Sequence, residues 1–330
     1  RRDFGGCAGN IAYSLKVLGG TPLPMATLGT DAADYLQRLK SLDISTEFVR
    51  QVPDTYTAQA MIMTDRDNNQ ITAFHPGAMM QAHITRIEKR ADIKLAIISP
   101  DGRDAMLQHA EQLNAADIPF VFDPGQGLPM FDGADLLRFI DQATWVTVND
   151  YEGKMLSDRT GLSHAEISKR VQGLVVTLGG EGCEVWIDGH STLVPPVKAA
   201  AVVDPTGCGD AYRAGLLYGI AHDWDWTRTG RLASLLGSIK IAQRGGQNRG
   251  AVVPAARAVR PISEDEAEVV PALGERRLNS AITEMPGRVS ASRPSSPSTA
   301  TFCLARWVNW RPARTSTGCS RTSTRPLTGA

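Results

Sequence analysis

The fold of this chain is indicated most clearly by residues 202–211, which read VVDPTGCGDA. Two valines lead into a glycine-rich turn, and the apolar spacing of residues 209–222 predicts a helix directly after it. Gly207 and Gly209 allow a tight turn whose backbone N–H groups can approach a ligand closely. The helix N-terminus adds unpaired donors and partial positive charge. The stretch therefore predicts a strand, a turn and a helix, with an anion site where turn and helix meet.

Asp210 lies in the first turn of the predicted helix. A carboxylate beside an anion site can accept a proton from a hydroxyl group that attacks a phosphoryl group. For the Gly-x-Gly-Asp pattern alone, a plain strand–helix turn with Asp210 as a favourable helix-terminal charge is the alternative. The full stretch in an α/β context favours the phosphoryl-transfer interpretation.

Strand-like and helix-like segments alternate through the first 243 residues. Apolar runs predict strands at 24–28, 95–99, 120–123, 145–148, 174–178 and 183–187. Helical spacing predicts helices at 10–18, 32–42, 104–116, 134–142, 151–157, 163–171, 209–222 and 228–243. This alternation predicts βαβ units and a mostly parallel sheet, an α/β fold. Residues 58–64 and 71–74 flank an Asp/Asn turn and predict a β-hairpin that forms a small lid.

The neutral total charge conceals two different parts. Residues 1–248 have 23 basic and 29 acidic residues, whereas residues 249–330 have 12 basic and 6 acidic residues, and all twelve of those cations are arginine. The second part is also rich in Pro, Ser and Thr and lacks apolar periodicity, so it predicts a low-complexity basic tail that is mostly disordered. No apolar run reaches the length of a membrane span, and five scattered cysteines favour a reducing cytoplasm.

Residues 204–210, DPTGCGD, resemble the second signature of the ribokinase-like carbohydrate and nucleoside kinases, the PfkB family. Three more segments resemble family motifs in the same order: GGCAGNIA at 5–12, NDYE at 149–152 and TLGGEG at 177–182. Residues 70–80 and 123–127 look most like a bacterial subgroup of adenosine kinase-like members. The resemblance implies a three-layer α/β/α core with a mostly parallel sheet and a small β lid.

The resemblance also implies roles for individual residues. Asp210 would be the base for a substrate hydroxymethyl group, beside an anion hole formed by Gly207, Cys208 and Gly209. The substrate side would be lined by Gly5, Gly6 and Asn10. The nucleotide would be bound by Thr177, Gly179 and Gly182. Magnesium would be held through water by Asn149 and Glu152, for which a helix-capping turn is the structural alternative. A monovalent cation near Asp204 and Thr206, as in some relatives, is an open alternative.

Two departures from the family pattern qualify these expectations. Relatives begin with a strand whose aspartate binds sugar hydroxyls, and this chain begins almost on its Gly-Gly motif, so we expect that strand to be missing. Its absence would leave neighbouring strands unpaired, the lid incomplete, and substrate binding and stability impaired. The tail replaces the family's last loop and helix. We therefore expect a kinase core at 1–248, with a lid at about 48–76, and a tail at 249–330.

The sequence thus predicts a cytoplasmic kinase that uses ATP and Mg²⁺ to phosphorylate a nucleoside, adenosine favoured, or a sugar. We expect neither a membrane nor a specific nucleic-acid partner, and a homodimer through the lid, weakened by the missing strands. One alternative is an inactive remnant or an interaction protein with a basic tail. Another is a dinucleotide-binding oxidoreductase, which the lack of a Gly-x-Gly-x-x-Gly turn after a first strand disfavours.

Overall fold

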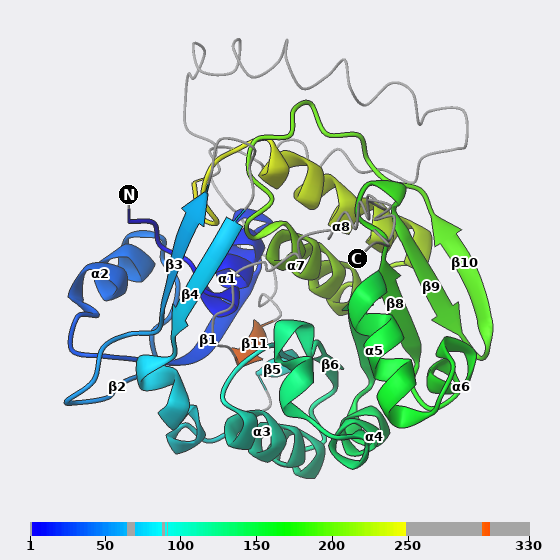
Figure 1. Cartoon of the computed structure of the whole chain (residues 1–330), viewed down its shortest axis with the longest axis horizontal. Coiled ribbons are helices and arrows are strands. Elements are labelled where there is room, and N and C mark those ends of the chain that lie inside the picture. The colour runs from blue at the N-terminus through cyan, green and yellow to red at the C-terminus, as the bar shows by residue number, and fades with distance from the viewer. Residues whose placement is uncertain (1, 65–69, 88–89, 91, 249–298, 304–330) are drawn as a thin grey trace, which may run out of the picture.

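The computed structural model describes residues 2–64, 70–87, 90, 92–248 and 299–303, which form a helix–sheet–helix sandwich (Figure 1). Its main sheet has nine strands in the order β10-β9-β8-β7-β6-β5-β11-β1-β2. The strands are β1 (Thr21–Leu28), β2 (Val49–Gln51), β5 (Ile93–Ile98), β6 (Phe120–Phe122), β7 (Trp145–Asn149), β8 (Gly173–Thr177), β9 (Cys183–Ile187), β10 (His190–Val194) and β11 (Thr299–Cys303). Neighbouring strands are parallel except for the pairs β8–β9 and β9–β10, which are antiparallel.

Helices cover both faces of the sheet. The helices are α1 (Cys7–Val17), α2 (Ala33–Ser41), α3 (Arg103–Ala115), α4 (Gly133–Gln142), α5 (Asp150–Thr160), α6 (His164–Ser168), α7 (Cys208–Ala221) and α8 (Trp226–Ile241). In β5, Leu95 and Ile97 pack with α1, α7 and α8, whereas Ala96 and Ile98 pack with α3 and α4. Alternate side chains of a buried strand point to opposite faces, so both layers of helices share this strand. The predicted three-layer α/β architecture is confirmed.

The predicted hairpin is also present. Strands β3 (Gln59–Thr64) and β4 (Gln70–His75) form a separate two-stranded antiparallel sheet. The lid expected from about residue 48 is smaller than that, because Val49–Gln51 pair with β1 and extend the main sheet. The described residues also contain three short 3₁₀ helices that periodicity did not predict: η1 (Gly77–Ile84), η2 (Gly125–Met130) and η3 (Gly179–Glu181).

Residues 202–211 differ from the prediction at their start. Val202 and Val203 form no strand and are 79% and 48% exposed. The backbone N–H groups of Val203 and Asp204 both donate to the carbonyl oxygen of Ile241, at 2.8 and 3.0 Å. These bonds tie the segment to the end of α8 instead of to the sheet. Apolar residues alone could not reveal this.

The expectation of unpaired strands near the start of the sheet is not met. β11 lies between β5 and β1 and pairs in parallel with both (Figure 1). Its sequence, TATFC, is rich in residues that favour strands. The rest of the predicted tail lies outside the described residues. Among the described residues, no helix has the length and apolar character needed to cross a membrane.

A buried carboxyl group after β5 gives a test of the fold. Asp101 is 2% exposed, its Oδ1 accepts the Gly102 N–H at 2.6 Å, and its Oδ2 has no partner among the described residues. Burial raises the pKa of Asp101 from 3.8 to about 8, against the smaller effect of the Gly102 N–H. The folded chain therefore holds this proton more tightly than the unfolded chain. The resulting stability is complete below pH 3.8 and is lost as the pH rises to about 8.

We predict that Asp101→Asn raises the melting temperature relative to the unmodified chain, and that its advantage grows between pH 5 and pH 8. Asparagine resembles the protonated acid and cannot ionise, and ~1 kcal/mol shifts Tm by about 2–4 °C in a domain of this size. Differential scanning fluorimetry at both pH values measures the effect. Asp104→Asn, at an exposed side chain of α3, is the control and should show no such trend. Equal shifts in both variants would contradict the prediction.

Candidate active site

Polar side chains gather at the carboxyl edge of the parallel sheet. Ser99, Asp123 and Asn149 lie at or directly after the ends of β5, β6 and β7, and Thr177 ends β8. These four strands are neighbours, and Asn149 pairs in register with Thr177. In open α/β sheets, ligands bind outside the carboxyl ends of the strands. This edge is therefore the candidate position of the site.

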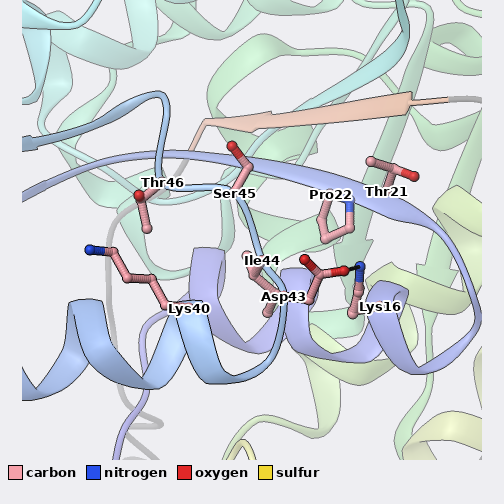
Figure 2. Close-up of a pocket in the computed structure, with 8 residues that line it drawn as sticks. All are labelled: Lys16, Thr21, Pro22, Lys40, Asp43, Ile44, Ser45 and Thr46. Carbon is pink, nitrogen blue, oxygen red and sulfur yellow. Dashed lines mark hydrogen bonds and ion pairs between the residues drawn. The ribbon is translucent and has the colours of Figure 1, made fainter.

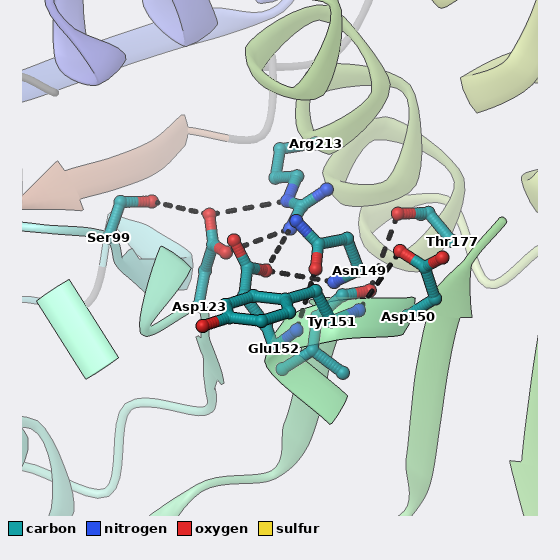
Figure 3. Close-up of polar contacts among 9 residues, drawn as sticks. Ser99, Asp123, Asn149, Asp150, Tyr151, Glu152, Thr177 and Arg213 are labelled. Atoms are coloured by element: carbon teal, nitrogen blue, oxygen red, sulfur yellow. Dashed lines mark hydrogen bonds and ion pairs between the residues drawn. The ribbon is translucent and has the colours of Figure 1, made fainter. Parts of the chain in front are cut away.

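Arg213 of α7 reaches the same edge and is buried there. Its Nη2 and Nε donate to the two carboxylate oxygens of Asp123 at 2.9 and 3.2 Å, a bidentate pair. Ser99 Oγ donates to Asp123 Oδ2 at 3.1 Å, and Glu152 Oε2 lies 3.9 Å from Arg213 Nη2. Figure 3 shows these side chains converging on the guanidinium from the strand ends below α7. The network fixes α7 against the sheet.

Asn149 and Glu152 form a reciprocal capping box at the start of α5. Asn149 Oδ1 accepts the Glu152 N–H at 2.7 Å, and Glu152 Oε2 accepts the Asn149 N–H at 2.8 Å. Glu152 is buried, and burial raises its pKa because desolvation outweighs the attraction of Arg213. The helix-capping turn that the sequence offered as a structural alternative for these two residues is thus present. It also places the Glu152 carboxylate beside the Arg213–Asp123 pair.

The N-termini of α1 and α7 meet at Asp210. Asn10, in α1 and 5% exposed, donates from Nδ2 to Asp210 Oδ2 at 2.7 Å. Gly207 caps α7 with φ of 80°, a left-handed conformation that favours glycine. A Cβ on Gly207 would stand 3.4 Å from Asn10 Nδ2 and 3.6 Å from Asp210 Oδ2, so this turn packs directly on the Asn10–Asp210 contact.

The carboxyl group of Asp210 is electrostatically perturbed. Burial raises its pKa, while the hydrogen bond from Asn10 lowers it. The charge of Asp123 also raises the pKa of Asp210, and a hydrogen bond with Cys7 and the charge of Arg213 lower it. A carboxylate with a raised pKa is a stronger base than an ordinary aspartate, which suits a residue that accepts a proton.

The anion hole predicted from Gly207, Cys208 and Gly209 is only partly open. The Cys208 N–H already donates to the Pro205 carbonyl oxygen at 3.1 Å. Gly207 and Gly209 lie at the start of α7, where N–H groups have no acceptor within the helix. These two N–H groups are therefore the ones that can face an anion.

The predicted substrate side lies around the start of α1. Gly6 caps α1, and its carbonyl oxygen accepts the Asn10 N–H at 2.9 Å. The carbonyl oxygen of Gly5 accepts the Tyr35 hydroxyl at 2.6 Å. Gln247 Nε2 donates to Tyr35 Oη at 2.9 Å and lies 3.3 Å from Asn10 Oδ1. Gly5, Gly6 and Asn10 are thus brought together with Gly207 and Asp210.

The predicted nucleotide loop follows β8. Thr177 Oγ1 lies 3.4 Å from the Val148 carbonyl oxygen, and Gly179 has open space where a side chain would point. Gly182, with φ of 97°, has a packing reason of its own, because a Cβ there would stand 2.2 Å from the Val194 carbonyl oxygen. The structure places this loop beside Asn149 through the β7–β8 pairing and gives it no direct bond to Asp210 among the described residues.

Sequence reasoning missed Arg213 and gave Asp123 no role. A signal existed for both, since Arg213 lies three positions after Asp210 on the same helix and Asp123 directly follows a buried strand. In the described part of the chain, no three His, Cys, Asp or Glu side chains converge as a metal site. Asn149 and Glu152 offer oxygen atoms at this edge, the donor type that magnesium prefers, and magnesium keeps several waters, so few protein ligands would suffice.

A separate hollow of about 390 Å³ opens at the other end of the sheet (Figure 2). Its lining comes from the end of α1, the start of β1, the end of α2 and the loop that follows. Lys16 within it is already paired with Asp43 at 2.6 Å. Since Thr21 begins β1, the hollow lies at the amino end of that parallel strand, away from the carboxyl edge.

The chain is similar to known kinases over most of its described length. Residues 1–251 match the pfkB family carbohydrate kinases. A nucleoside kinase of Methanocaldococcus jannaschii is 30% identical over 250 residues, which cover 75% of this chain and 82% of that protein. The solved structure of Burkholderia thailandensis nucleoside kinase in complex with inosine is 56% identical, with a TM-score of 0.75, covering 78% of this chain and 85% of that one. The structure of the same kinase in complex with ADP-inosine has the same identity and TM-score, and the match covers 78% of this chain and 82% of that one. These neighbours confirm the ribokinase-like fold.

We predict that Arg213→Met lowers the free energy of unfolding by ~3–5 kcal/mol, because it leaves two buried carboxyl groups without their cation. Arg138→Met is the matched control. Its partner Glu111 is half-exposed like Arg138 itself, so the loss should be about 0–1 kcal/mol. Urea denaturation measures both. Similar small losses in the two variants would show that the buried pair does not hold α7 in place.

Proposed function

The chain belongs to the pfkB family of carbohydrate kinases, and from this premise we propose that it transfers a phosphoryl group from ATP to the hydroxymethyl group of a nucleoside. The observation that carries the proposal is the contact of Asn10 with Asp210 at 2.7 Å. It holds a carboxylate at a helix N-terminus whose glycine turn can face an anion. A base beside an anion site is what this transfer needs.

Asp210 is the proposed base. It accepts the proton of the substrate hydroxyl group as that oxygen attacks the phosphorus atom, and its raised pKa makes it a better acceptor. The hydrogen bond from Asn10 fixes the orientation of the carboxylate. The N–H groups of Gly207 and Gly209 donate to the oxygens of the transferring group, where negative charge develops.

Magnesium and ATP are assigned to the neighbouring part of the carboxyl edge. Bound magnesium neutralises phosphate charge during the transfer. Glu152 and Asn149 would hold it through water, since magnesium keeps several of its waters and needs few protein ligands. Thr177, Gly179 and Gly182 would bind the nucleotide. The open space beside Gly179 supports this part of the proposal, whereas the packing of Gly182 on Val194 gives that glycine a structural role as well.

The proposed substrate is a purine nucleoside, bound against Gly5, Gly6 and Asn10. The motif resemblance favours adenosine. The inosine complex of a kinase 56% identical to this chain supports inosine equally, so we include both. A cytoplasmic location is part of the proposal, since ATP is available there and Cys7, Cys183 and Cys208 form no disulfide within the described residues.

We predict that the full chain phosphorylates adenosine or inosine with ATP and Mg²⁺, and that Asp210→Asn lowers kcat by ~10²–10⁴-fold. Coupled assays of ADP release measure the rate. Asp34→Asn is the control, because Asp34 is also in the first turn of a helix but is exposed. A rate for Asp210→Asn within a few-fold of the control would refute the role of the base. No turnover by folded, unmodified chain would favour the alternative, an inactive remnant.

The lid supports a second part of the proposal, a homodimer. Met61, Met63 and Ile71 on β3 and β4 are 53%, 62% and 70% exposed. An apolar face on a two-stranded sheet is a common contact surface. A second copy of the chain offers the same face and could cover it.

We predict that Ile71→Lys shifts the chain from dimer to monomer in sedimentation velocity, because a charge replaces apolar contact area. Ile187→Lys, at a 40% exposed position on β9 in the main sheet, is the control and should leave the dimer intact. A monomeric unmodified chain at micromolar concentration would refute the proposed interface.

A further inference from the structure

Lys240 is a buried cation that the proposed reaction does not use. It lies near the end of α8 and is 0% exposed. Its Nζ donates to the carbonyl oxygens of Asp204 and Gln243, both at 2.9 Å. Removing an ammonium group from water costs several kcal/mol unless polar groups replace its hydration. The backbone carbonyls therefore form a cradle for one positive charge.

This cradle joins two loops. Asp204 begins the turn that leads to Asp210, and Gln243 lies in the loop after α8. The Asp204 carboxylate accepts the Thr206 N–H at 2.9 Å and the Gly245 N–H at 2.8 Å, so it bridges the same two loops. Although burial alone would raise the pKa of Asp204, these N–H donors and the nearby charge of Lys240 lower it. Asp204 thus remains an anion beside the ammonium group.

Both loops lead directly to the candidate active site. A Cβ on Gly246 would stand 2.4 Å from Asn10 Oδ1, and one on Gly207 would stand 3.4 Å from the Gly246 Cα. Gln247 also contacts Asn10. The loop after α8 therefore packs against Asn10, while the turn from Asp204 carries Gly207 and Asp210. The distance between this loop and this turn therefore determines how Asn10 contacts Asp210.

A dissociable monovalent cation does not fit this arrangement. The sequence resemblance had implied one near Asp204 and Thr206. The Asp204 carbonyl oxygen already accepts the ammonium group, and a second cation beside that charge would be repelled. Both oxygens of the Asp204 carboxylate already accept backbone N–H groups, from Thr206 and Gly245. The charge that a free ion would supply is already present in the chain.

We propose that the Lys240 ammonium group is a built-in monovalent cation that positions the 204–210 turn against the 242–247 loop, so that catalysis needs no free potassium or sodium ion. This inference rests on the proposed kinase function. Lys240 is a positioning residue, since it acts on Asp210 through the two loops.

The first test uses the unmodified full chain and compares its kinase rate and melting temperature in potassium and tetramethylammonium chloride at equal ionic strength. The built-in cation predicts rates within about twofold and an unchanged Tm, since screening is the same in both salts. A large, saturable increase of either quantity with potassium would overturn the proposal. This comparison needs no variant, so it stands even where a variant fails to fold.

The second test uses Lys240→Met, which removes the charge and keeps most of the side-chain volume. We expect kcat to fall by at least ~10-fold, as loss of positioning commonly causes. Potassium or ammonium ions, but not tetramethylammonium, should restore part of kcat and raise Tm. Lys154→Met, at an exposed lysine of α5, is the control and should respond to neither ion.

The outcomes separate this inference from the proposed function. A rise of Tm with potassium confined to Lys240→Met would support the cradle even if the chain phosphorylated no nucleoside, in which case only the kinase proposal would fail. A Lys240→Met variant that keeps full activity, or whose loss no small cation restores in rate or Tm, would overturn the built-in cation.

Discussion

The buried guanidinium of Arg213 is the constraint on which the site depends. It forms a bidentate pair with Asp123 and faces Glu152, so one cation on α7 holds carboxylates from two positions at the edge of the sheet. Burial alone would lower the pKa of Arg213, but these two carboxylates raise it, and the group stays charged. Because a buried pair is costly to break, α7 has little freedom to move away from the strand ends.

The Arg213 pair fixes the position of the first turn of α7, and this turn contains Asp210, the proposed base. Asp210 lies one turn before Arg213 and meets Asn10 of α1, a residue 200 positions away in the chain. The loop after α8 closes the same point from the other side through Gln247 and Gly246. Three segments far apart in sequence thus converge on one carboxylate, and the packing is tight at Gly246, where a Cβ would stand 2.4 Å from Asn10 Oδ1.

The sequence predicted most of the helices and strands, and it predicted Asn10, Gly207 and Asp210 as site residues that the fold brings together. Alternating apolar runs predicted β5 to β9 closely, and the four motifs located the residues that the fold brings together. It did not predict β11, because this strand lies in a Pro/Ser/Thr-rich segment that lacks apolar periodicity. It placed Val202 and Val203 in a strand because apolar character does not reveal that their backbone binds α8.

The remaining differences come from long-range contacts. Lys240 lies within the helix predicted at 228–243, and only the fold shows that its ammonium group donates to two backbone carbonyl oxygens. The role of Arg213 becomes evident only from its pairing with Asp123, which lies 90 residues earlier in the chain. Capping at Asn149 and Glu152 was foreseen as an alternative, and the structure adds that the capped carboxylate also faces the cation of α7.

The central claim is that Asp210 activates a hydroxymethyl group for attack on a phosphoryl group bound at the start of α7. The most direct measurement is the position of the phosphate in the product formed from ATP, Mg²⁺ and inosine or adenosine. Phosphorus NMR with proton coupling distinguishes the possible positions. The account predicts a phosphorus atom coupled to the two protons of the CH₂ carbon of the ribose. A phosphate on a ring hydroxyl, or release of inorganic phosphate without transfer, would contradict it.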